Sequence, residues 1–318
     1  MWISPYKYVL SLGHLYSDIN QSILSAVLPF LIATYHYDYT TAAMLVTVSN
    51  VFGAFVQPFI GMLSDKKNKL LYMTLGVLLA SGGMAVTGFI SNFFGLCIVV
   101  IISGIGVVMF HPQAAKLVNS VSSKNAKGKG MSIFSFGGKV GFTLGPVYTA
   151  FLMNLFGMKG TILFLIPGIV FGIVCSFFNK DFENLDVLEV EKKEKVKSEQ
   201  KDDWSGFIKL CCVVFSRSIL SNGISTFLAF YFIQQFSKSN SFASMLLSVF
   251  YGIGSITLLG GGIADCFGHR KMVRLSFCIF LPAIFIFANT SHFVIALIML
   301  IFMTCGESLS YSPMVVLG

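Results

Sequence analysis

The sequence predicts an all-α membrane protein, a bundle of about ten transmembrane helices. Hydrophobic residues make up 55% of the 318 residues, charged residues make up 11%, and the mean hydropathy is +0.79. A soluble domain usually carries about 25% charged residues. This composition therefore argues against a soluble enzyme, a disordered chain or a nucleic-acid-binding protein, despite the net charge of +8.

Ten apolar runs follow one another, each near the ~20 residues that a spanning helix needs. They do not show the alternation of polar and apolar residues expected of strands in a membrane β-barrel. The first run contains His14, Asp18 and Asn20 and lacks a small-residue cleavage site, so we interpret it as a retained span and not as a signal peptide. The runs lie near residues 7–34, 41–63, 70–90, 93–117, 131–156, 160–178, 206–235, 242–264, 272–289 and 293–317.

Basic residues orient the predicted spans. Lys and Arg gather in the loops near 64–69, 118–130 and 265–271, which places these loops and the N-terminus in the cytoplasm. The stretch 180–203 has 15 charged residues in 24, so we interpret it as a solvated linker. We therefore expect a six-helix bundle at 1–179, a charged cytoplasmic linker at 180–203 and an incomplete bundle of four helices at 204–318.

A short motif at the end of two spans indicates an internal repeat. Gly61 and Asp65 form G-x-x-x-D at the end of the second run, and Gly261 and Asp265 form it at the end of the eighth, at an offset of 200 residues. Each copy leads into a basic loop. The second loop also carries Gly268 and Arg270.

A second match supports the same repeat. His111-Pro112 in the fourth run corresponds to Ser312-Pro313 in the tenth, at an offset of 201 residues. Two nearly equal offsets at corresponding runs favour two related halves of six spans each. Because the second half holds only four runs, we expect a twelve-span architecture of which this chain contains ten; an inactive, truncated product is one alternative.

A parallel 6+6 repeat with G-x-x-x-D after the second and eighth spans resembles the major facilitator superfamily of transporters, although each copy departs from the family's full motif. The fifth run reads Gly137-x-x-x-Gly141-x-x-x-Gly145-Pro146, which is similar to a motif of the drug:proton antiporter branch. Glycines at i, i+4 and i+8 also let a neighbouring helix approach closely, so helix packing alone is the alternative.

A narrower resemblance is to the fosmidomycin resistance subfamily. His14-x-x-x-Asp18-x-x-Gln21 in the first run, Phe110-His111-Pro112-Gln113 in the fourth and the glycine stripe carry it. The resemblance implies a bacterial inner-membrane exporter of small antimicrobial compounds, driven by inward proton flow. The residues alone indicate only a multi-span transporter, so an importer or exchanger of organic anions on the same fold is the alternative.

Ionisable residues inside apolar runs cost about 2.5–3.5 kcal/mol each, which makes each of them a candidate functional group. His14, Asp18 and Gln21 lie at i, i+4 and i+7, on one face of the first helix. The candidates for proton coupling are Asp18, His14, His111 and Glu307. A structural contact between helices is the alternative for the first pair, and a contact at a helix kink is the alternative for His111.

Two cations inside the spans favour an anionic or zwitterionic substrate. Lys139 lies in the fifth run and Arg217 in the seventh, and they would repel each other unless an anion or a carboxylate lay between them. We therefore take Arg217, Lys139 and Gln21 as candidates for substrate binding. Lys139 could instead extend to the cytoplasmic interface. For Glu307 we expect Ser310 and Tyr311 as partners.

The sequence predicts neither an enzyme nor a metalloprotein. It contains no HExxH, no Gly-x-Ser-x-Gly and no Walker motif, and its seven cysteines show no CxxC or His/Cys ligand spacing. We expect no cofactor and no metal. The expected partners are the lipid bilayer, protons and a small-molecule substrate, with no nucleic acid and a monomeric chain.

Overall fold

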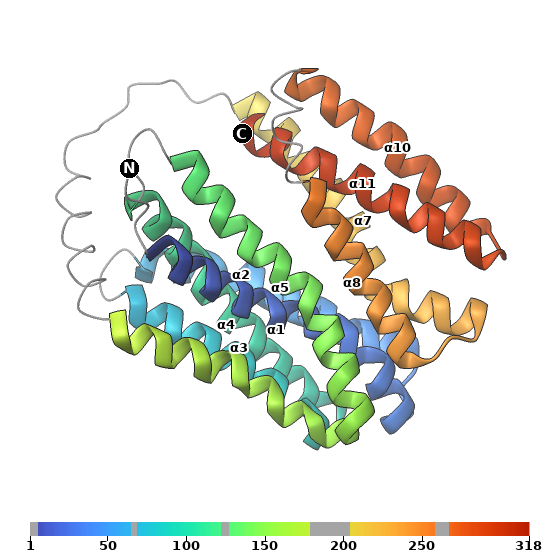
Figure 1. Ribbon diagram of the computed structural model, residues 1–318, viewed down its shortest axis with the longest axis horizontal. Helices are drawn as coiled ribbons and strands as arrows, with labels where there is room; N and C mark the ends of the chain where they lie inside the picture. The colour runs from blue at the N-terminus through green and yellow to red at the C-terminus, as the bar shows by residue number, and fades with distance from the viewer. Residues whose placement is uncertain (1–5, 65–68, 122–126, 179–203, 258–266, 318) are drawn as a thin grey trace. The chain divides into compact units, whose positions relative to one another are not determined.

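The computed structural model describes the chain in five stretches, within which all regular structure is helical (Figure 1). No strand occurs in these stretches. The chain divides into two compact units, Met1–Lys197 and Ser198–Gly318, and each is described by itself. The described residues are 6–64, 69–121, 127–178, 204–257 and 267–317.

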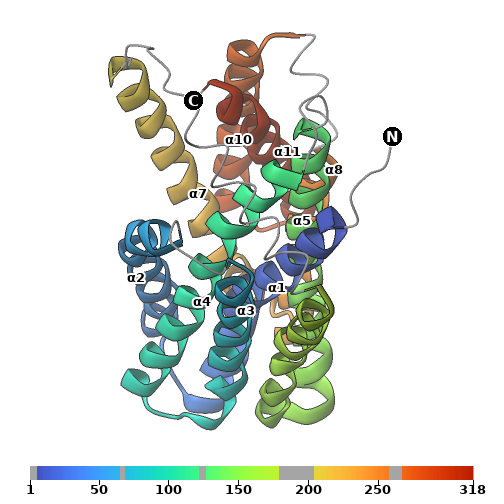
Figure 2. The same ribbon diagram turned by 90° about the vertical axis from the view of Figure 1, so that its left-hand side faces the viewer.

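The first unit is a bundle of helices (Figure 2). Among its candidate membrane spans, α1 is the most deeply buried. α1 packs against α5 and α4, whereas α2 and α3 both pack against α4. Short 3-10 segments, η1 (Thr87–Phe89) and η3 (Gly157–Leu165), follow α3 and α5, and residues 166–178 are helical. The long helices are α1 (Tyr6–Tyr35), α2 (Tyr39–Ser64), α3 (Lys69–Val86), α4 (Phe93–Val121) and α5 (Lys127–Phe156).

The glycine stripe of the fifth run packs α5 directly onto α1. A Cβ added at Gly137, Gly141 or Gly145 would lie 2.2 Å from Ser11 O, 2.3 Å from Leu15 O or 2.0 Å from Ser22 Oγ. Such distances are far inside van der Waals contact, so only glycine permits this approach. The close packing positions the residues of α1 and α5 that build the site described below.

The second unit contains a smaller set of helices. α10 packs along α11, and α8 contacts both α7 and α11. In the described part of the whole chain, seven helices are long and apolar enough to cross a membrane, and a shorter apolar helix spans Phe293–Leu309. The elements of this unit are α7 (Trp204–Phe236), α8 (Asn240–Thr257), α10 (His269–Asn289) and α11 (Phe293–Leu317).

The connection between the first two helices is the same in both units. α1 and α7 are each followed by a residue with positive φ, His36 at 57° and Ser237 at 51°. The next helix then begins with a side-chain cap: Asp38 Oδ1 accepts the N–H three residues later at 2.6 Å, and Ser239 Oγ does so at 3.2 Å. His36 and Ser237 are 201 residues apart, and so are Asp38 and Ser239. The repeat therefore extends to the backbone conformation of this connection.

A contact between corresponding helices repeats as well. A Cβ at Gly106 on α4 would lie 2.4 Å from the backbone nitrogen of Ala80 on α3. A Cβ at Gly306 on α11 would lie 2.9 Å from the backbone nitrogen of Phe280 on α10. Gly106 and Gly306 are 200 residues apart, and so are Ala80 and Phe280. The same close contact therefore brings α4 onto α3 and α11 onto α10.

Candidate functional site

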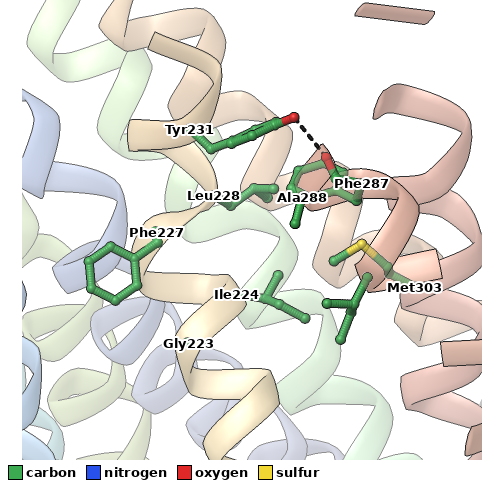
Figure 3. A pocket seen from close by; sticks show the side chains of 9 residues that line it. Gly223, Ile224, Phe227, Leu228, Tyr231, Phe287, Ala288 and Met303 are labelled. Atoms are coloured by element: carbon green, nitrogen blue, oxygen red, sulfur yellow. Dashed lines mark hydrogen bonds between the residues drawn. The ribbon is translucent and has the colours of Figure 1, made fainter. Parts of the chain in front are cut away.

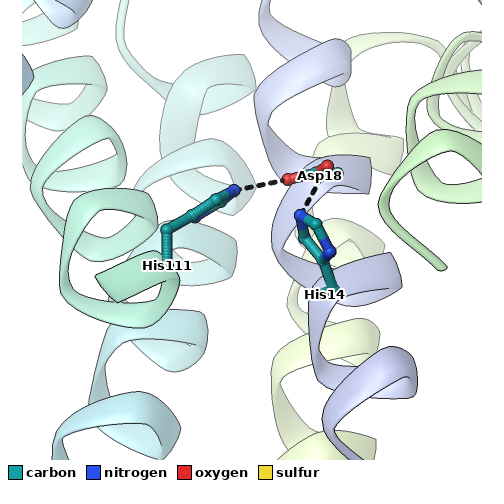
Figure 4. Close-up of side chains that lie close together, drawn as sticks. All are labelled: His14, Asp18 and His111. Carbon is teal, nitrogen blue, oxygen red and sulfur yellow. Dashed lines mark ion pairs between the residues drawn. The ribbon is translucent and has the colours of Figure 1, made fainter. Parts of the chain in front are cut away.

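Three ionisable side chains from two helices meet inside the first unit (Figure 4). His14 and Asp18 lie one turn apart on α1, and His111 reaches them from α4. Nε2 of His14 is 3.2 Å from Oδ2 of Asp18, and Nε2 of His111 is 3.0 Å from Oδ1. The side chains of Asp18, His14 and His111 are 4%, 12% and 33% exposed, so His111 is the most accessible member. We call these residues the His–Asp–His cluster.

Backbone carbonyls orient both imidazole rings. Nδ1 of His14 is 2.8 Å from the carbonyl of Phe134 on α5, and Nδ1 of His111 is 2.9 Å from the carbonyl of Val107 on α4. A carbonyl oxygen only accepts, so both Nδ1 atoms carry a proton and donate it. Each Nε2 therefore faces the Asp18 carboxylate. A proton on either Nε2 or the carboxylate makes their contact attractive, and without a proton the two lone pairs repel each other. A proton between Asp18 and either histidine would thus stabilise the cluster.

Two aromatic side chains and the backbone of a glycine pack against the cluster. The ring of Phe134 stacks on His14 with centroids 4.0 Å apart, and Phe110 and Phe134 belong to the apolar core around it. On α5, a Cβ at Gly138 would lie 2.5 Å from Oδ2 of Asp18 and 2.6 Å from Nε2 of His14. Apolar surroundings make an unpaired charge costly here, so the three groups depend on one another.

The second unit holds a different buried ion pair. The guanidinium of Arg217 on α7 donates to the carboxylate of Glu307 on α11, and the two side chains are 12% and 10% exposed. Ser221 donates to Oε1 at 3.3 Å and Ser308 to Oε2 at 3.3 Å. Glu307 therefore supplies the carboxylate that a buried Arg217 requires.

The remaining predicted ligands are more accessible than Asp18 and Glu307. Gln21 is exposed, although it shares the face of α1 that carries the buried Asp18. Lys139 follows Gly138 on α5 and is partly exposed. Of the partners expected for Glu307, the side chains of Ser310 and Tyr311 lie outside the described residues.

Half of the predicted loop motif lies in the described part of the chain. A Cβ at Gly61 would meet nothing within 4 Å, so packing does not require a glycine there. Gly268 has φ of +87° and precedes α10, a backbone conformation that favours glycine, and Arg270 is exposed in the first turn of α10. Asp65, Gly261 and Asp265 lie outside the described residues.

An apolar cavity of about 260 Å³ in the second unit was not foreseen from the sequence (Figure 3). It lies among α7, α10 and α11. Tyr231 borders it and donates its hydroxyl to the carbonyls of Phe287 at 2.8 Å and Thr290 at 3.0 Å, which leaves an almost wholly apolar lining. The lining residues are Gly223, Ile224, Phe227, Leu228, Tyr231, Ile284, Phe287, Ala288 and Met303.

A possible set of metal ligands was not expected from the sequence. One ligand atom from each of His14, Asp18 and His111 lies within 4.8 Å of the others. The expectation of no metal site rested on short ligand spacings. His14 and Asp18 give the only local signal, one helical turn, because the third ligand comes from a distant helix.

Comparison with known proteins identifies a family and several relatives. The family model described as Major Facilitator Superfamily matches residues 10–318. The chain is 23% identical over 276 residues to the Fosmidomycin resistance protein of Escherichia coli strain K12, which covers 83% of this chain and 66% of that protein. It is 24% identical over 278 residues to the Uncharacterized MFS-type transporter YfnC of Bacillus subtilis strain 168, covering 85% and 68%. The chain therefore spans about two thirds of the length of these curated relatives.

A shorter match and two solved structures complete the comparison. The chain is 27% identical over 148 residues, 45% of its length and 36% of the relative's, to the Multi-drug resistance efflux pump PmrA of Streptococcus pneumoniae. An inward-facing, occupied bacterial homolog of the human lysosomal transporter Spinster matches with a TM-score of 0.80 at 16% identity, covering 98% of this chain and 73% of that one. The D-xylose-proton symporter matches with a TM-score of 0.74 at 15% identity, covering 98% and 81%. At these identities the structures indicate a shared fold.

Proposed function

The chain belongs to the Major Facilitator Superfamily, and from that premise we propose that it exports a small antimicrobial compound in exchange for protons. Membership confirms the resemblance noted in the sequence and places the protein among multi-pass membrane transporters, not among enzymes. Two of the relatives carry names that refer to fosmidomycin resistance and multidrug efflux. These names support transport of a drug-like compound out of the cell.

The His–Asp–His cluster is the observation that carries the proton-coupled part of the proposal. Asp18 is buried and the two histidines of α1 and α4 are partly buried, and protons are what makes their contacts of 3.0 and 3.2 Å with Asp18 attractive. When a proton leaves, one Nε2 lone pair faces a carboxylate oxygen at the same distance, and the two repel. Loss of the proton would therefore push α1 and α4 apart at this level, which links protonation to helix position.

Arg217 is the residue that we propose as the substrate anchor. A guanidinium binds carboxylate and phosphate-like groups in two-point contacts, which suits an anionic or zwitterionic compound such as a phosphonate. Arg217 already forms an ion pair with Glu307, so the substrate would compete with this carboxylate for the guanidinium. Glu307, once displaced, would become a further site for proton uptake. Lys139 and Gln21 stay as secondary candidates for substrate contact.

We further propose the membrane arrangement that the basic loops predict. In it, ten spans cross the bacterial inner membrane with the N-terminus in the cytoplasm, and the protein acts as a monomer. The segment 1–179 forms the first bundle and 204–318 belongs to the second, joined by the charged linker. Each of the ten apolar runs overlaps helical residues, which supports this count. Labelling of cysteines introduced in the linker should then require permeable cells.

The proposal is tested with the substitution Asp18→Asn in reconstituted vesicles. Asn keeps the volume of the side chain but cannot be ionised, so efflux of fosmidomycin driven by a pH gradient should be lost. Exchange of labelled for unlabelled compound, which needs no net proton movement, should survive. Asp38→Asn is the matched control, because Asp38 is an exposed cap at the start of α2. Full pH-driven efflux by the Asp18→Asn protein would overturn proton coupling through the cluster.

A second function, exchange of organic anions without protons, is favoured by one observation. The Arg217–Glu307 pair provides an anion anchor whose charge does not depend on the His–Asp–His cluster. If the wild-type protein exchanges anions across the membrane and a pH gradient changes nothing, this second function replaces the first.

A further inference from the structure

Two imidazole nitrogens and a carboxylate of the His–Asp–His cluster are spaced like the ligands of a metal ion. The Nε2 atoms of His14 and His111 are 3.2 and 3.0 Å from the nearest oxygens of Asp18, and the three ligand atoms lie within 4.8 Å of one another. In a tetrahedral site with bonds of about 2.0–2.1 Å, neighbouring ligand atoms are about 3.3 Å apart. Each histidine is thus at a coordinating separation from one oxygen of Asp18, and a small closing movement would bring three ligand atoms around one ion.

The outer contacts of both histidines are those that ligating histidines usually have. Each Nδ1–H donates to a backbone carbonyl, of Phe134 in one case and of Val107 in the other. Such a contact fixes the ring and leaves Nε2 as the atom that can bind a metal. Phe134 also stacks on the ring of His14, which restricts its rotation. The two Nε2 atoms are therefore presented by supports that are independent of Asp18.

The backbone of α5 lies close against one side of the cluster, and one oxygen of Asp18 on the other side depends on His111. Gly138 carries no side chain where a Cβ would stand 2.5 Å from Oδ2 of Asp18 and 2.6 Å from Nε2 of His14. Oδ1 of Asp18 is buried, and Nε2 of His111 lies 3.0 Å from it. When this Nε2 carries no proton, the oxygen has no donor, which is costly, and a bound cation would satisfy it.

We propose that the His–Asp–His cluster binds one first-row divalent transition-metal ion of the Zn²⁺ class. Its ligands would be Nε2 of His14, the carboxylate of Asp18 and Nε2 of His111. Imidazole nitrogen is a preferred ligand of Zn²⁺, and three protein ligands leave one tetrahedral position for water. The inference goes beyond the proposed transport function, because binding needs only the first unit. A bound ion would join α1 to α4 and so oppose any separation of these helices.

Zn²⁺ itself is the probe for the first experiment. The purified full-length chain, with its affinity tag removed, is stripped with a chelator and titrated with Zn²⁺ against a fluorescent chelator at constant neutral pH. We expect one ion per chain, and an affinity lower by about tenfold or more in Asp18→Asn and in His111→Gln. His292→Gln, a histidine outside the cluster, is the control and should bind as the wild type does. Co²⁺ gives a visible absorption band as a second readout, which the same two variants should lose.

Two glycines of the same stripe provide a matched pair of variants. Gly138→Ala places a methyl group against the cluster, whereas Gly145→Ala places one 2.0 Å from Ser22 Oγ, away from it. Both disturb the packing of α5 on α1, so both should lower thermal stability, but only Gly138→Ala should lose the ion. If both glycine variants fail to fold, His111→Gln decides, since this side chain is the most exposed of the three.

The proposal is wrong if the folded wild-type chain binds no Zn²⁺ at micromolar concentration. It is equally wrong if Asp18→Asn and His111→Gln bind the ion as tightly as the wild type. Proton-driven transport measured in the presence of a chelator examines the proposed function separately. Failure of the metal site and failure of proton coupling therefore give different results.

Discussion

The two units share a scaffold but bury different charges in it. In each unit an ion pair joins the first helix to the fourth described one, through Asp18 and His111 between α1 and α4 and through Arg217 and Glu307 between α7 and α11. The acid is on the first helix in one unit and on the fourth described helix in the other. The caps and glycine contacts of the two units correspond at offsets of 200 or 201 residues, but the charged pairs do not.

This difference indicates that the residues that determine helix packing vary independently of the buried charged residues. The residue 201 positions after Asp18 is Ile219, and the residue 200 positions before Glu307 is Val107. A histidine pair can gain or lose charge near neutral pH, whereas a guanidinium stays charged. The proposed change of protonation therefore belongs to the first unit and the proposed permanent anchor to the second.

Removal of one member of the second unit's pair should have the largest effect on stability. Glu307→Gln leaves the buried guanidinium of Arg217 without its counter-charge, so we expect a loss of about 3–5 kcal/mol in the free energy of unfolding. Asp18→Asn should cost less, because both histidines facing it can become neutral. Unfolding in mixed micelles measures the loss of stability of both variants.

The double variant Arg217→Met/Glu307→Met is the control and should recover most of the loss. An equal loss of stability in Glu307→Gln and Asp18→Asn would contradict the distinction between the two pairs.

The repeated glycine contact allows a second comparison of the units. A Cβ at Gly106 would meet backbone of α3 at 2.4 Å, and one at Gly306 would meet backbone of α10 at 2.9 Å. Gly106→Ala should therefore destabilise by about 2–3 kcal/mol and Gly306→Ala by about 1 kcal/mol, since overpacking costs rise with overlap. Thermal unfolding of each variant gives the order. The reverse order would show that the two contacts are not equivalent.

The repeated cap should give the smallest effect, and in one of its two copies this effect should depend on pH. Hydrogen bonds from Thr41 hold the pKa of the exposed Asp38 carboxyl below its ordinary value. A lowered pKa stabilises the folded state above the ordinary value of about 3.9, and this stabilisation is lost as the pH falls further. Asp38→Ala and Ser239→Ala should each lower the Tm by about 1–3 °C at neutral pH. Only the Asp38→Ala difference should shrink in acid; a parallel decrease for Ser239→Ala would contradict this account.

Much of the fold followed from the sequence because it depends on local patterns. Apolar run lengths predicted helices, and two motif pairs predicted a repeat whose offset recurs in the positive-φ residues His36 and Ser237. The sixth run was less simple than expected, since its first part lies in the 3-10 segment η3, Gly157–Leu165. Glycine at 157, with φ of +58°, permits the turn that precedes this segment.

The site was only half predictable, because helix periodicity gives neighbours on one helix and not across helices. The i, i+4 spacing brought His14 and Asp18 together correctly. The same argument extended to Gln21, which is exposed in the structure. The arrival of His111 from α4, and of Glu307 beside Arg217, depends on the rotation of one helix against another. That rotation is set by close contacts such as those of the glycines, whose partners a single sequence does not reveal.

Gly138 shows that a residue without any functional group can govern a site made of ionisable ones. One added carbon there would displace a carboxylate and an imidazole that belong to another helix. Substitutions at residue 138 should therefore be tolerated as rarely as those at His14 or Asp18. A survey of variants that considers only titratable positions would overlook Gly138, where the site could be altered without changing the protein's charge.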